Sequence, residues 1–201
     1  MAQLIAALIG SYLIGSIPTA YLLVKWLKRI DVRTVGSGNV GATNVTRVAG
    51  MKAGAVVFLL DVAKGLAAVL LIAPWLLSEL TLARQLACGF AAVLGHMFPV
   101  FLAFRGGKGV ATTIGVLIGT MPLIAGVCLL VWVGCFLVWR MVSVASLAAA
   151  VTIPLTQLAT HQGLPVVLLG TTMAVLILIR HRANLERLLR GSEHRFGSPR
   201  V

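Results

Sequence analysis

Long apolar runs separated by short polar stretches fill almost the whole sequence. A helix needs roughly 20 mostly apolar residues to span the hydrocarbon core of a bilayer, so runs of this length predict transmembrane helices. The predicted helices cover residues 4–27, 53–77, 86–104, 111–119, 122–139, 142–160 and 164–179. The apolar stretch 110–139 is divided because residues 119–122, Gly-Thr-Met-Pro, are typical of a turn. The pattern therefore predicts an all-α, polytopic membrane helix bundle with about seven transmembrane helices.

The composition supports this class of protein. Of the 201 residues, 59% are hydrophobic and 11% are charged, whereas soluble domains are about half apolar and about a quarter charged. So little charge excludes a single soluble domain, and so few polar residues exclude a disordered chain. We expect one integral membrane domain, residues 1–201, whose segment 180–201 forms a basic tail. The cysteines, Cys88, Cys128 and Cys135, lie in apolar runs and form no disulfide or zinc framework.

The basic residues predict the orientation. There are 17 Lys and Arg against 5 Asp and Glu, which gives a formal net charge of +12. With seven spans, every Lys and Arg up to Arg200 falls on one side, except Lys64 inside a span and Arg84 on the opposite side. Cytoplasmic loops are enriched in these residues, so we expect the N-terminus outside and the C-terminus in the cytoplasm. The basic residues form no continuous stripe, which argues against a nucleic acid partner.

The first cytoplasmic loop, residues 33–47, carries the groups that bind phosphate. Its glycines allow close approach of the backbone to a ligand, and successive N–H groups in such a loop can form an anion nest. Side-chain hydrogen-bond donors and one planar cation complete the set. The groups singled out are Ser37, Gly38, Asn39, Thr43, Asn44 and Arg47. The alternative interpretation is a flexible polar turn.

A second glycine-rich loop, residues 104–113, surrounds a lysine. Gly106 and Gly107 precede Lys108, and a predicted helix follows, so N–H groups and the helix dipole favour an anion. The loop is no Walker nucleotide site, because Lys108 is followed by Gly109 rather than Ser or Thr. The alternative interpretation is anchoring at the membrane surface by basic residues.

The segment 181–193 contributes a third polar element. If it continues the last predicted helix, His181 and Asn184 share one face and can turn toward the membrane surface. A solvated, basic amphipathic tail is the alternative. Ser143 and Ser146 open the helix at 142–160, where they either cap it or face the site.

Three ionisable residues lie inside predicted spans. Asp61 and Lys64 are three residues apart, so we expect a structural ion pair that also positions the first loop. His96 is more typical of a hydrogen-bonded core residue than of a ligand. No metal-ligand spacing, no G-x-S-x-G elbow and no thiolate nucleophile occurs in the sequence. An enzyme of this sequence is expected to work by positioning and electrostatics, without a metal or cofactor.

The segments GSGNVGATNVTR, DVAKG, GHMFPVFLAFRGGKGVAT and HRANLERLLRGSE together resemble the bacterial acyl-phosphate:glycerol-3-phosphate acyltransferase family, integral membrane type. They run in order from Gly36 to Glu193, with Arg105 where Lys is common and Ser192 where Thr is common. The resemblance implies a seven-helix enzyme of the bacterial inner membrane, monomeric, with its site facing the cytoplasm. It would transfer a fatty acyl chain from acyl phosphate to the 1-hydroxyl of glycerol 3-phosphate, in contact with membrane lipid. The products would be lysophosphatidic acid and phosphate, formed without an acyl-enzyme, and the donor phosphate would take the hydroxyl proton.

The resemblance also implies roles for individual residues. The acyl-donor phosphate would be held by Ser37, Gly38 and Asn39. Catalysis would depend on Ser37, Lys108, His181 and Asn184. Substrate binding would involve Gly38, Asn39, Thr43, Arg47, Gly106, Gly107 and Ser146. Of these, Thr43, Arg47, Lys108, Ser146, His181 and Asn184 would serve glycerol 3-phosphate and its orientation.

Two other classes of protein explain part of the pattern. A transporter or channel for a phosphorylated anion also needs a basic site among helices, although such proteins often show inverted repeats and midplane sites. Here no internal repeat is found, and the polar motifs gather on one side. A non-catalytic membrane scaffold would not need three loops of glycines and cations.

Overall fold

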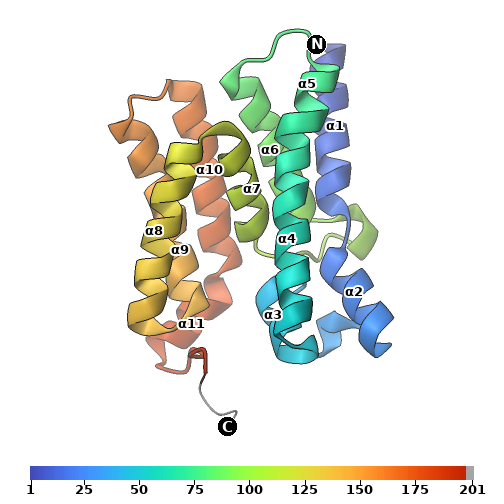
Figure 1. Cartoon of the computed structure of the whole chain (residues 1–201), viewed down its shortest axis with the longest axis vertical. Helices are drawn as coiled ribbons and strands as arrows, with labels where there is room; N and C mark the ends of the chain where they lie inside the picture. The colour runs from blue at the N-terminus through green and yellow to red at the C-terminus, as the bar shows by residue number, and fades with distance from the viewer. Residues whose placement is uncertain (198–201) are drawn as a thin grey trace. The chain divides into compact units, whose positions relative to one another are not determined.

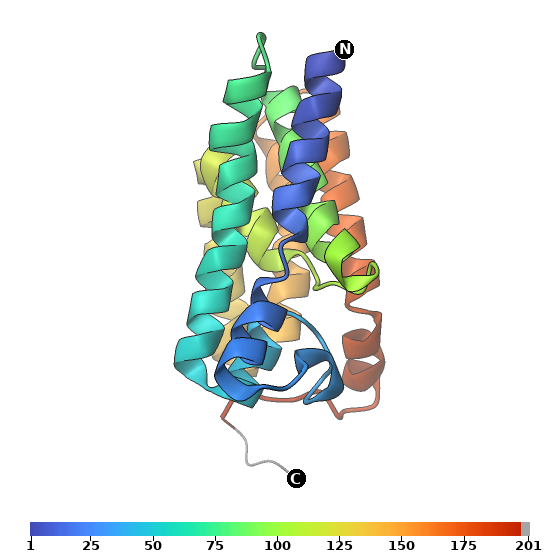
Figure 2. The same ribbon diagram turned by 90° about the vertical axis from the view of Figure 1, so that its right-hand side faces the viewer.

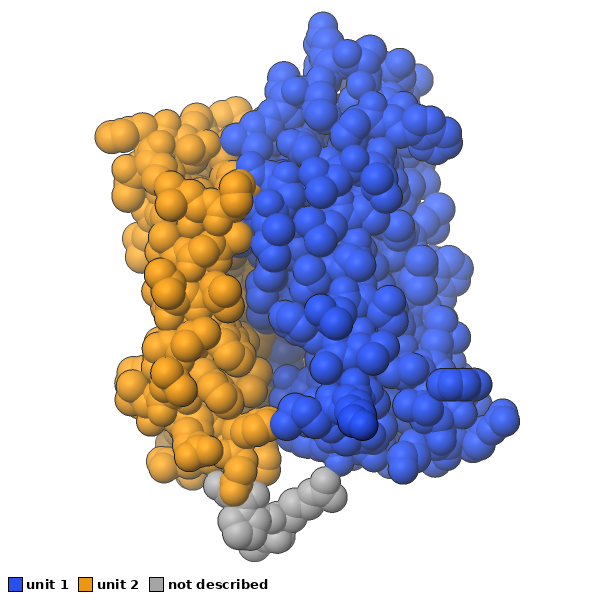
Figure 3. Space-filling model, viewed as in Figure 1, with its two compact units in different colours: residues 1–120 blue, residues 121–201 orange. Residues whose placement is uncertain are grey.

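The computed structural model describes residues 1–197, and Arg200 and the end of the predicted tail lie outside them. The chain forms two compact units, Met1–Thr120 and Met121–Val201, which Figure 3 colours separately. Within residues 1–197 every regular element is a helix and no strand occurs, as Figure 1 shows. The predicted all-α class is therefore confirmed.

Unit 1 begins with two helices where the sequence predicted one at 4–27. Helix α1 (Ala2–Ser16) and helix α2 (Thr19–Lys28) are separated at Ile17 and Pro18. Proline has no N–H to continue a helix, and it drives the residue before it into an extended conformation, as Ile17 shows with φ −57° and ψ 118°. The prediction of an unbroken helix was wrong at this proline.

The helix predicted at 53–77 contains a wider turn. It runs as α4 (Met51–Ala67), the π-helical turn η2 (Ala68–Ile72) and α5 (Ala73–Leu76). Gln85 of the next helix, α6 (Leu82–Met97), donates from Nε2 to the Val69 carbonyl at 2.8 Å. A π-turn disturbs the regular ladder of helical hydrogen bonds, and this side chain binds a carbonyl within it.

The remaining elements of unit 1 carry the polar loops. They are η1 (Val32–Thr34), α3 (Ala42–Ala49), η3 (Val100–Leu102) and α7 (Val110–Thr120). Helix α7 packs closely on α4, and glycine permits this approach. A Cβ at Gly65 would overlap the Thr112 carbonyl, and one at Gly115 would overlap the Val62 carbonyl. Within unit 1, α2 and α3 lie at the end opposite the N-terminus of α1 (Figure 2).

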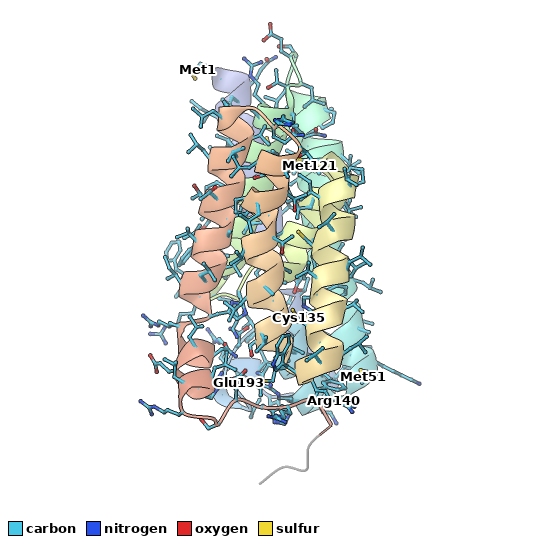
Figure 4. All side chains as sticks on the ribbon, turned by 90° about the vertical axis from the view of Figure 1, so that its left-hand side faces the viewer. Met1, Met51, Met121, Cys135, Arg140 and Glu193 are labelled. Carbon is cyan, nitrogen blue, oxygen red and sulfur yellow. The ribbon has the colours of Figure 1, made fainter. Side chains whose placement is uncertain are left out.

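Unit 2 consists of α8 (Pro122–Trp139), α9 (Val142–Ala159), α10 (Leu164–Arg180) and α11 (Arg182–Leu189). The predicted break before Pro122 is confirmed. The chain bends at His181, so that the axes of α10 and α11 differ by 57° and the two helices do not form one straight helix. Arg140 and Glu193 lie at one end of this unit and Met121 at the other (Figure 4).

Five helical stretches among residues 1–197 are long and apolar enough to cross a membrane, or six if the bent pair α10–α11 is one span. They are Ala2–Lys28, Met51–Leu76, Leu82–Leu102, Pro122–Trp139 and Val142–Ala159. Helix α7 is shorter than these, with 11 residues. The polytopic architecture agrees with the prediction, while the number seven and the orientation of the termini stay predictions.

Candidate active site

The first polar loop is built around the side chain of Asn44. This residue lies in the first turn of α3 and is 2% exposed. Its Oδ1 accepts from the Ser37 N–H at 2.8 Å, and its Nδ2 donates to the carbonyls of Val32, Val35 and Asn39 at 3.2, 3.1 and 3.0 Å. One amide thus satisfies four main-chain groups and fixes the path of residues 32–39.

Glycine is required where this path turns. Gly36 has φ +62°, and a Cβ there would overlap Asn44 Oδ1. Gly38 has φ +68° and donates its N–H to the Val35 carbonyl at 3.1 Å. The resulting turn leaves Ser37 and Gly38 exposed, with Asn39 half-buried. The loop therefore presents the Ser37 hydroxyl at its surface, while the N–H groups of Ser37 and Gly38 donate within the loop.

An ion pair lies at the N-terminal end of the same loop. Arg33 donates from Nε and Nη2 to Asp31, and its guanidinium lies 5.4 Å from the ring centre of Tyr21. Hydrogen bonds from the Arg33 side chain and main chain hold the pKa of Asp31 below its ordinary value. The charge of Arg33 is therefore balanced locally by Asp31. Thr43 and Arg47, which the sequence singled out, lie half-buried in α3.

The second polar loop folds back on the end of α6. Gly106 and Gly107 are buried, and their N–H groups donate to the carbonyls of Met97 and His96 at 3.2 and 3.0 Å. Lys108 is half-buried and precedes Gly109, which has φ +84° and accepts from the Thr113 N–H at 2.9 Å. The lysine thus stands at the N-terminal turn of α7, where helix N–H groups and the dipole favour an anion.

The two loops meet over one hydrophobic core in unit 1. Val40 from the first loop and Leu102, just before the second, belong to the same buried cluster. They also line one small cavity of about 10 Å³ together with Lys64 and His96. The first loop and the residue that leads into the second therefore share one core within this unit, while a common ligand for the two loops stays a prediction.

Unit 2 holds the other predicted groups. His181 is 3% exposed, and its Nδ1 donates to the Ile177 carbonyl at 2.8 Å, which fixes the orientation of the ring. Asn184 is 6% exposed and lies in the first turn of α11, where its N–H donates to the His181 carbonyl at 2.8 Å. Ser146 is buried, and its Oγ accepts from Trp132 Nε1 at 3.3 Å.

A carboxylate holds this end of unit 2 together. Glu193 Oε1 accepts from Ser143 Oγ and Asn184 Nδ2, each at 2.7 Å, and Oε2 accepts from Arg187 Nε at 2.8 Å. Burial raises the pKa of Glu193, but the hydrogen bonds from these three side chains outweigh it, so the pKa lies below its ordinary value. The serine thus binds the carboxylate rather than capping its own helix.

The structure corrects one expectation about unit 2 and adds two residues. His181 and Asn184 are both buried, but they sit on either side of a bend rather than along one straight helix. Sequence reasoning did not assign roles to Glu193 or Trp132. The signal for Glu193 was an acidic residue in a basic segment. Among residues 1–197, no group of three or more His, Cys, Asp or Glu could hold a metal ion.

These features define an all-helical membrane protein with two glycine-and-cation loops over a common core. The family described as glycerol-3-phosphate acyltransferase matches residues 5–191. A protein of that name from Myxococcus xanthus is 48% identical over 191 residues, covering 95% of this chain and 98% of that protein. One from Aquifex aeolicus is 45% identical over 194 residues, covering 94% and 96%.

Solved structures agree with the sequence comparisons. A crystal structure of PlsY (YgiH), an integral membrane glycerol 3-phosphate acyltransferase, in its glycerol 3-phosphate form superposes with a TM-score of 0.89 at 44% identity. The match covers 98% of this chain and 96% of that one. The lysophosphatidic acid form gives a TM-score of 0.86 at 41% identity, with the same coverage. The chain therefore belongs to the integral membrane glycerol-3-phosphate acyltransferase family.

Proposed function

We propose that this chain transfers a fatty acyl group from acyl phosphate to the 1-hydroxyl of glycerol 3-phosphate, giving lysophosphatidic acid and inorganic phosphate. The observation that carries the proposal is the meeting of the two glycine-and-cation loops over one buried core. Two neighbouring phosphate-binding loops suit a reaction in which both substrates carry phosphate. Membership of the family and the likeness to a glycerol 3-phosphate form support the choice of acceptor.

Each loop has a part in the proposal. Ser37, Gly38 and Asn39 hold the phosphate of the acyl donor, because their turn exposes the Ser37 hydroxyl and leaves Asn39 only half-buried. Lys108, at the start of α7, stabilises a phosphate as a compact charge. Glycerol 3-phosphate and its orientation are served by Thr43, Arg47, Lys108, Ser146, His181 and Asn184. Gly106 and Gly107 bring the backbone close to bound substrate.

The proposed chemistry needs no covalent enzyme intermediate and no metal or cofactor. The 1-hydroxyl oxygen bonds to the acyl carbonyl carbon, the bond from that carbon to the phosphate oxygen breaks, and the departing phosphate takes the hydroxyl proton. Holding the two reactants side by side supplies up to roughly 7–11 kcal/mol of the barrier. Cations and N–H groups that hold the ground-state phosphates also stabilise the negative charge that develops on the carbonyl oxygen and leaving group.

We further propose that the two units act as one monomeric membrane domain of the bacterial inner membrane, with seven spans and the site facing the cytoplasm. The asymmetry of the basic residues supports this orientation. Single cysteines introduced at Thr34 and Ser78, in a variant without the native cysteines, test it. In inside-out vesicles Thr34→Cys should react with an impermeant reagent and Ser78→Cys should not; the reverse pattern would overturn the orientation.

One reconstitution tests the activity. Purified protein in lipid vesicles receives acyl phosphate and labelled glycerol 3-phosphate, and both product and internal label are measured. Acylated product supports the enzyme. Accumulation of unchanged glycerol 3-phosphate in the vesicles would instead identify an anion transporter. If neither product nor uptake were found, the remaining interpretation would be a non-catalytic scaffold.

A variant then tests the proposed site. Lys108→Ala should lower the rate of transfer by about 1,000-fold or more, since a phosphate-binding cation in a water-poor site is worth several kcal/mol. The matched control is Lys28→Ala, which removes an exposed lysine at the end of α2. If Lys108→Ala keeps full activity while folded, this lysine does not belong to the site.

A further inference from the structure

Four polar side chains form a buried cluster in unit 1 that the proposed reaction does not use. Asp61 and Lys64 of α4 pair at 2.7 Å, and they are 1% and 6% exposed. Thr19, the first residue of α2, donates to Asp61 at 2.7 Å and accepts from Lys64 at 3.2 Å. His96 of α6 is 7% exposed, and its Nδ1 lies 3.5 Å from Asp61 Oδ1. Ionisable groups inside a span are costly, so a cluster of this kind is a candidate for function.

The cluster fixes the ring of His96. Its Nδ1 edge faces the Asp61 carboxylate, which is already bound by Lys64 and Thr19 and therefore cannot turn freely. A histidine whose one ring nitrogen is directed at a held carboxylate has its orientation set, as in carboxylate–histidine pairs elsewhere. The other nitrogen, Nε2, then points away from Asp61.

That second edge lies against the Lys108 loop. A Cβ built at Gly107 would overlap His96 Nε2, and one built at Gly106 would overlap the His96 carbonyl oxygen. The same carbonyl accepts the Gly107 N–H at 3.0 Å. His96 therefore contacts the loop through both its main chain and its ring, immediately before Lys108.

The position of the cluster also relates it to the first loop. Lys64, His96 and Thr19 line the small cavity that Val40 and Leu102 border. These last two residues come from the two polar loops and share one core. The cluster thus lies where the supports of both loops meet, rather than at a lipid-facing part of unit 1.

We propose that Asp61 and Lys64 hold His96 as a positioning residue, and that His96 sets the path of residues 106–109 and hence the position of Lys108. This inference rests on the proposed function for its kinetic consequence, since Lys108 is assigned to glycerol 3-phosphate. Its structural part, the support of the loop by His96, stands independently of the activity.

The first test is kinetic. His96→Ala should raise the KM for glycerol 3-phosphate at least about tenfold and also lower kcat at saturation, because a displaced Lys108 stabilises the transition state less well. The matched control is Leu86→Ala, which truncates a fully buried residue of the same helix away from the loop. A purely structural role predicts the same loss of thermal stability in both variants and no change in KM. That result would overturn the proposal.

The second test uses the contact between His96 and Gly107. Gly107→Ala alone should raise the same KM, because its Cβ overlaps the ring. In the double variant with His96→Ala the ring is gone, so the added methyl should do no further harm. A KM for the double variant equal to that of His96→Ala supports the contact, whereas multiplied effects would show that the two residues act separately.

The third test needs no activity. Amide hydrogen exchange of a peptide containing residues 106–109 should be faster in His96→Ala than in the wild type and in Leu86→Ala. If His96→Ala does not fold, His96→Asn replaces it, because its amide can still face Asp61 but does not reach Gly107. Unchanged exchange overturns the proposal. Faster exchange in a protein that acylates nothing would instead disprove the proposed function and leave the positioning role standing.

Discussion

Two buried polar side chains organise two different regions, and they do so in different ways. Asn44 binds four main-chain groups of a single loop in unit 1. Glu193 binds three side chains, Ser143 of α9 and Asn184 and Arg187 of α11, in unit 2. The neutral amide determines the shape of one loop, whereas the carboxylate joins separate helices.

The difference follows from the hydrogen bonds that each group can make. An amide both donates and accepts. It can therefore bind the main-chain groups of residues 32–39, which lack the regular pairing of a helix or sheet. A carboxylate only accepts, so it gathers donors, and its charge strengthens each bond. A loop that must keep one shape over a wide pH range is suited to the amide. The carboxylate makes the end of unit 2 dependent on a proton.

The largest expected effect is that of Asn44→Asp. The new carboxylate is isosteric but turns an acceptor toward the carbonyls that Nδ2 now binds. Each buried carbonyl left without a donor costs about 1–3 kcal/mol, so we expect a loss of about 3–5 kcal/mol in stability. Transfer activity should fall at least about 100-fold. Steady-state kinetics and thermal unfolding in lipid measure both.

Gln3→Glu is the matched control for this variant, because it makes the same change of atoms at an exposed site of α1. It should leave stability and activity almost unchanged. If Asn44→Asp behaved like this control, the amide would not be the organiser of the loop, and the contrast with Glu193 would disappear.

The next effect in size is that of Glu193→Gln. Whichever way the new amide turns, a donor replaces one of the two accepting oxygens and faces Arg187 or the pair Ser143 and Asn184. We expect a loss of about 1–3 kcal/mol and an approximately tenfold fall in transfer rate, through displacement of Asn184. Glu186→Gln, at an exposed position of α11, should change neither quantity. Equal behaviour of the two variants would contradict the assigned role.

The sequence predicted the helices well because a bilayer imposes their length. Apolar runs of sufficient length placed α8, α9, α10 and the continuous stretch from α4 to α5 within a few residues of their observed bounds. The breaks were harder to predict. Pro18 is a known helix breaker, but the apolar run continues past it, and the bend at His181 has no proline or glycine to mark it.

The site was predictable in its residue types and not in their supports. Glycines and cations near one another in sequence indicate phosphate binding, so loops 33–47 and 104–113 could be found directly. Asn44 was taken as one more donor to a ligand, whereas it faces the loop itself. Its role, and those of Glu193 and His96, depend on contacts between residues 5 to 50 positions apart, which no local pattern encodes.

The defects of Glu193→Gln and Asn44→Asp should both shrink in acid, but for opposite reasons: the wild type loses a stabilising charge in one case, and the variant regains a donor in the other. The pKa of Glu193 is lower in the folded protein than its ordinary value of 4.5, so its stabilisation is fully present above that ordinary value. It is lost as the pH falls through the lowered value. The stability difference between wild type and Glu193→Gln should therefore shrink as the pH falls below about 4. The defect of Asn44→Asp should also shrink in acid, but because that variant regains a donor on protonation.

Melting temperatures of the three proteins at intervals between about pH 3 and pH 7 measure this contrast. Asp31 also has a lowered pKa and weakens every one of them in acid, so only differences between proteins at the same pH are compared. A wild-type advantage over Glu193→Gln that stays constant to pH 3 would show that the charge of Glu193 contributes nothing.

The smallest expected effect separates the donors of Glu193 from one another. Ser143→Ala removes a buried hydroxyl that donates at 2.7 Å, and we expect a loss of about 0.5–1.5 kcal/mol. Arg187→Gln should lose less than this despite its charge, because its side chain is 42% exposed and water screens the pair. In a double-mutant cycle, Ser143→Ala should cause almost no further loss in Glu193→Gln, where its acceptor is already disturbed. Full additivity would mean that Ser143 stabilises α9 by another contact, and Glu193 would then join fewer helices than its hydrogen bonds indicate.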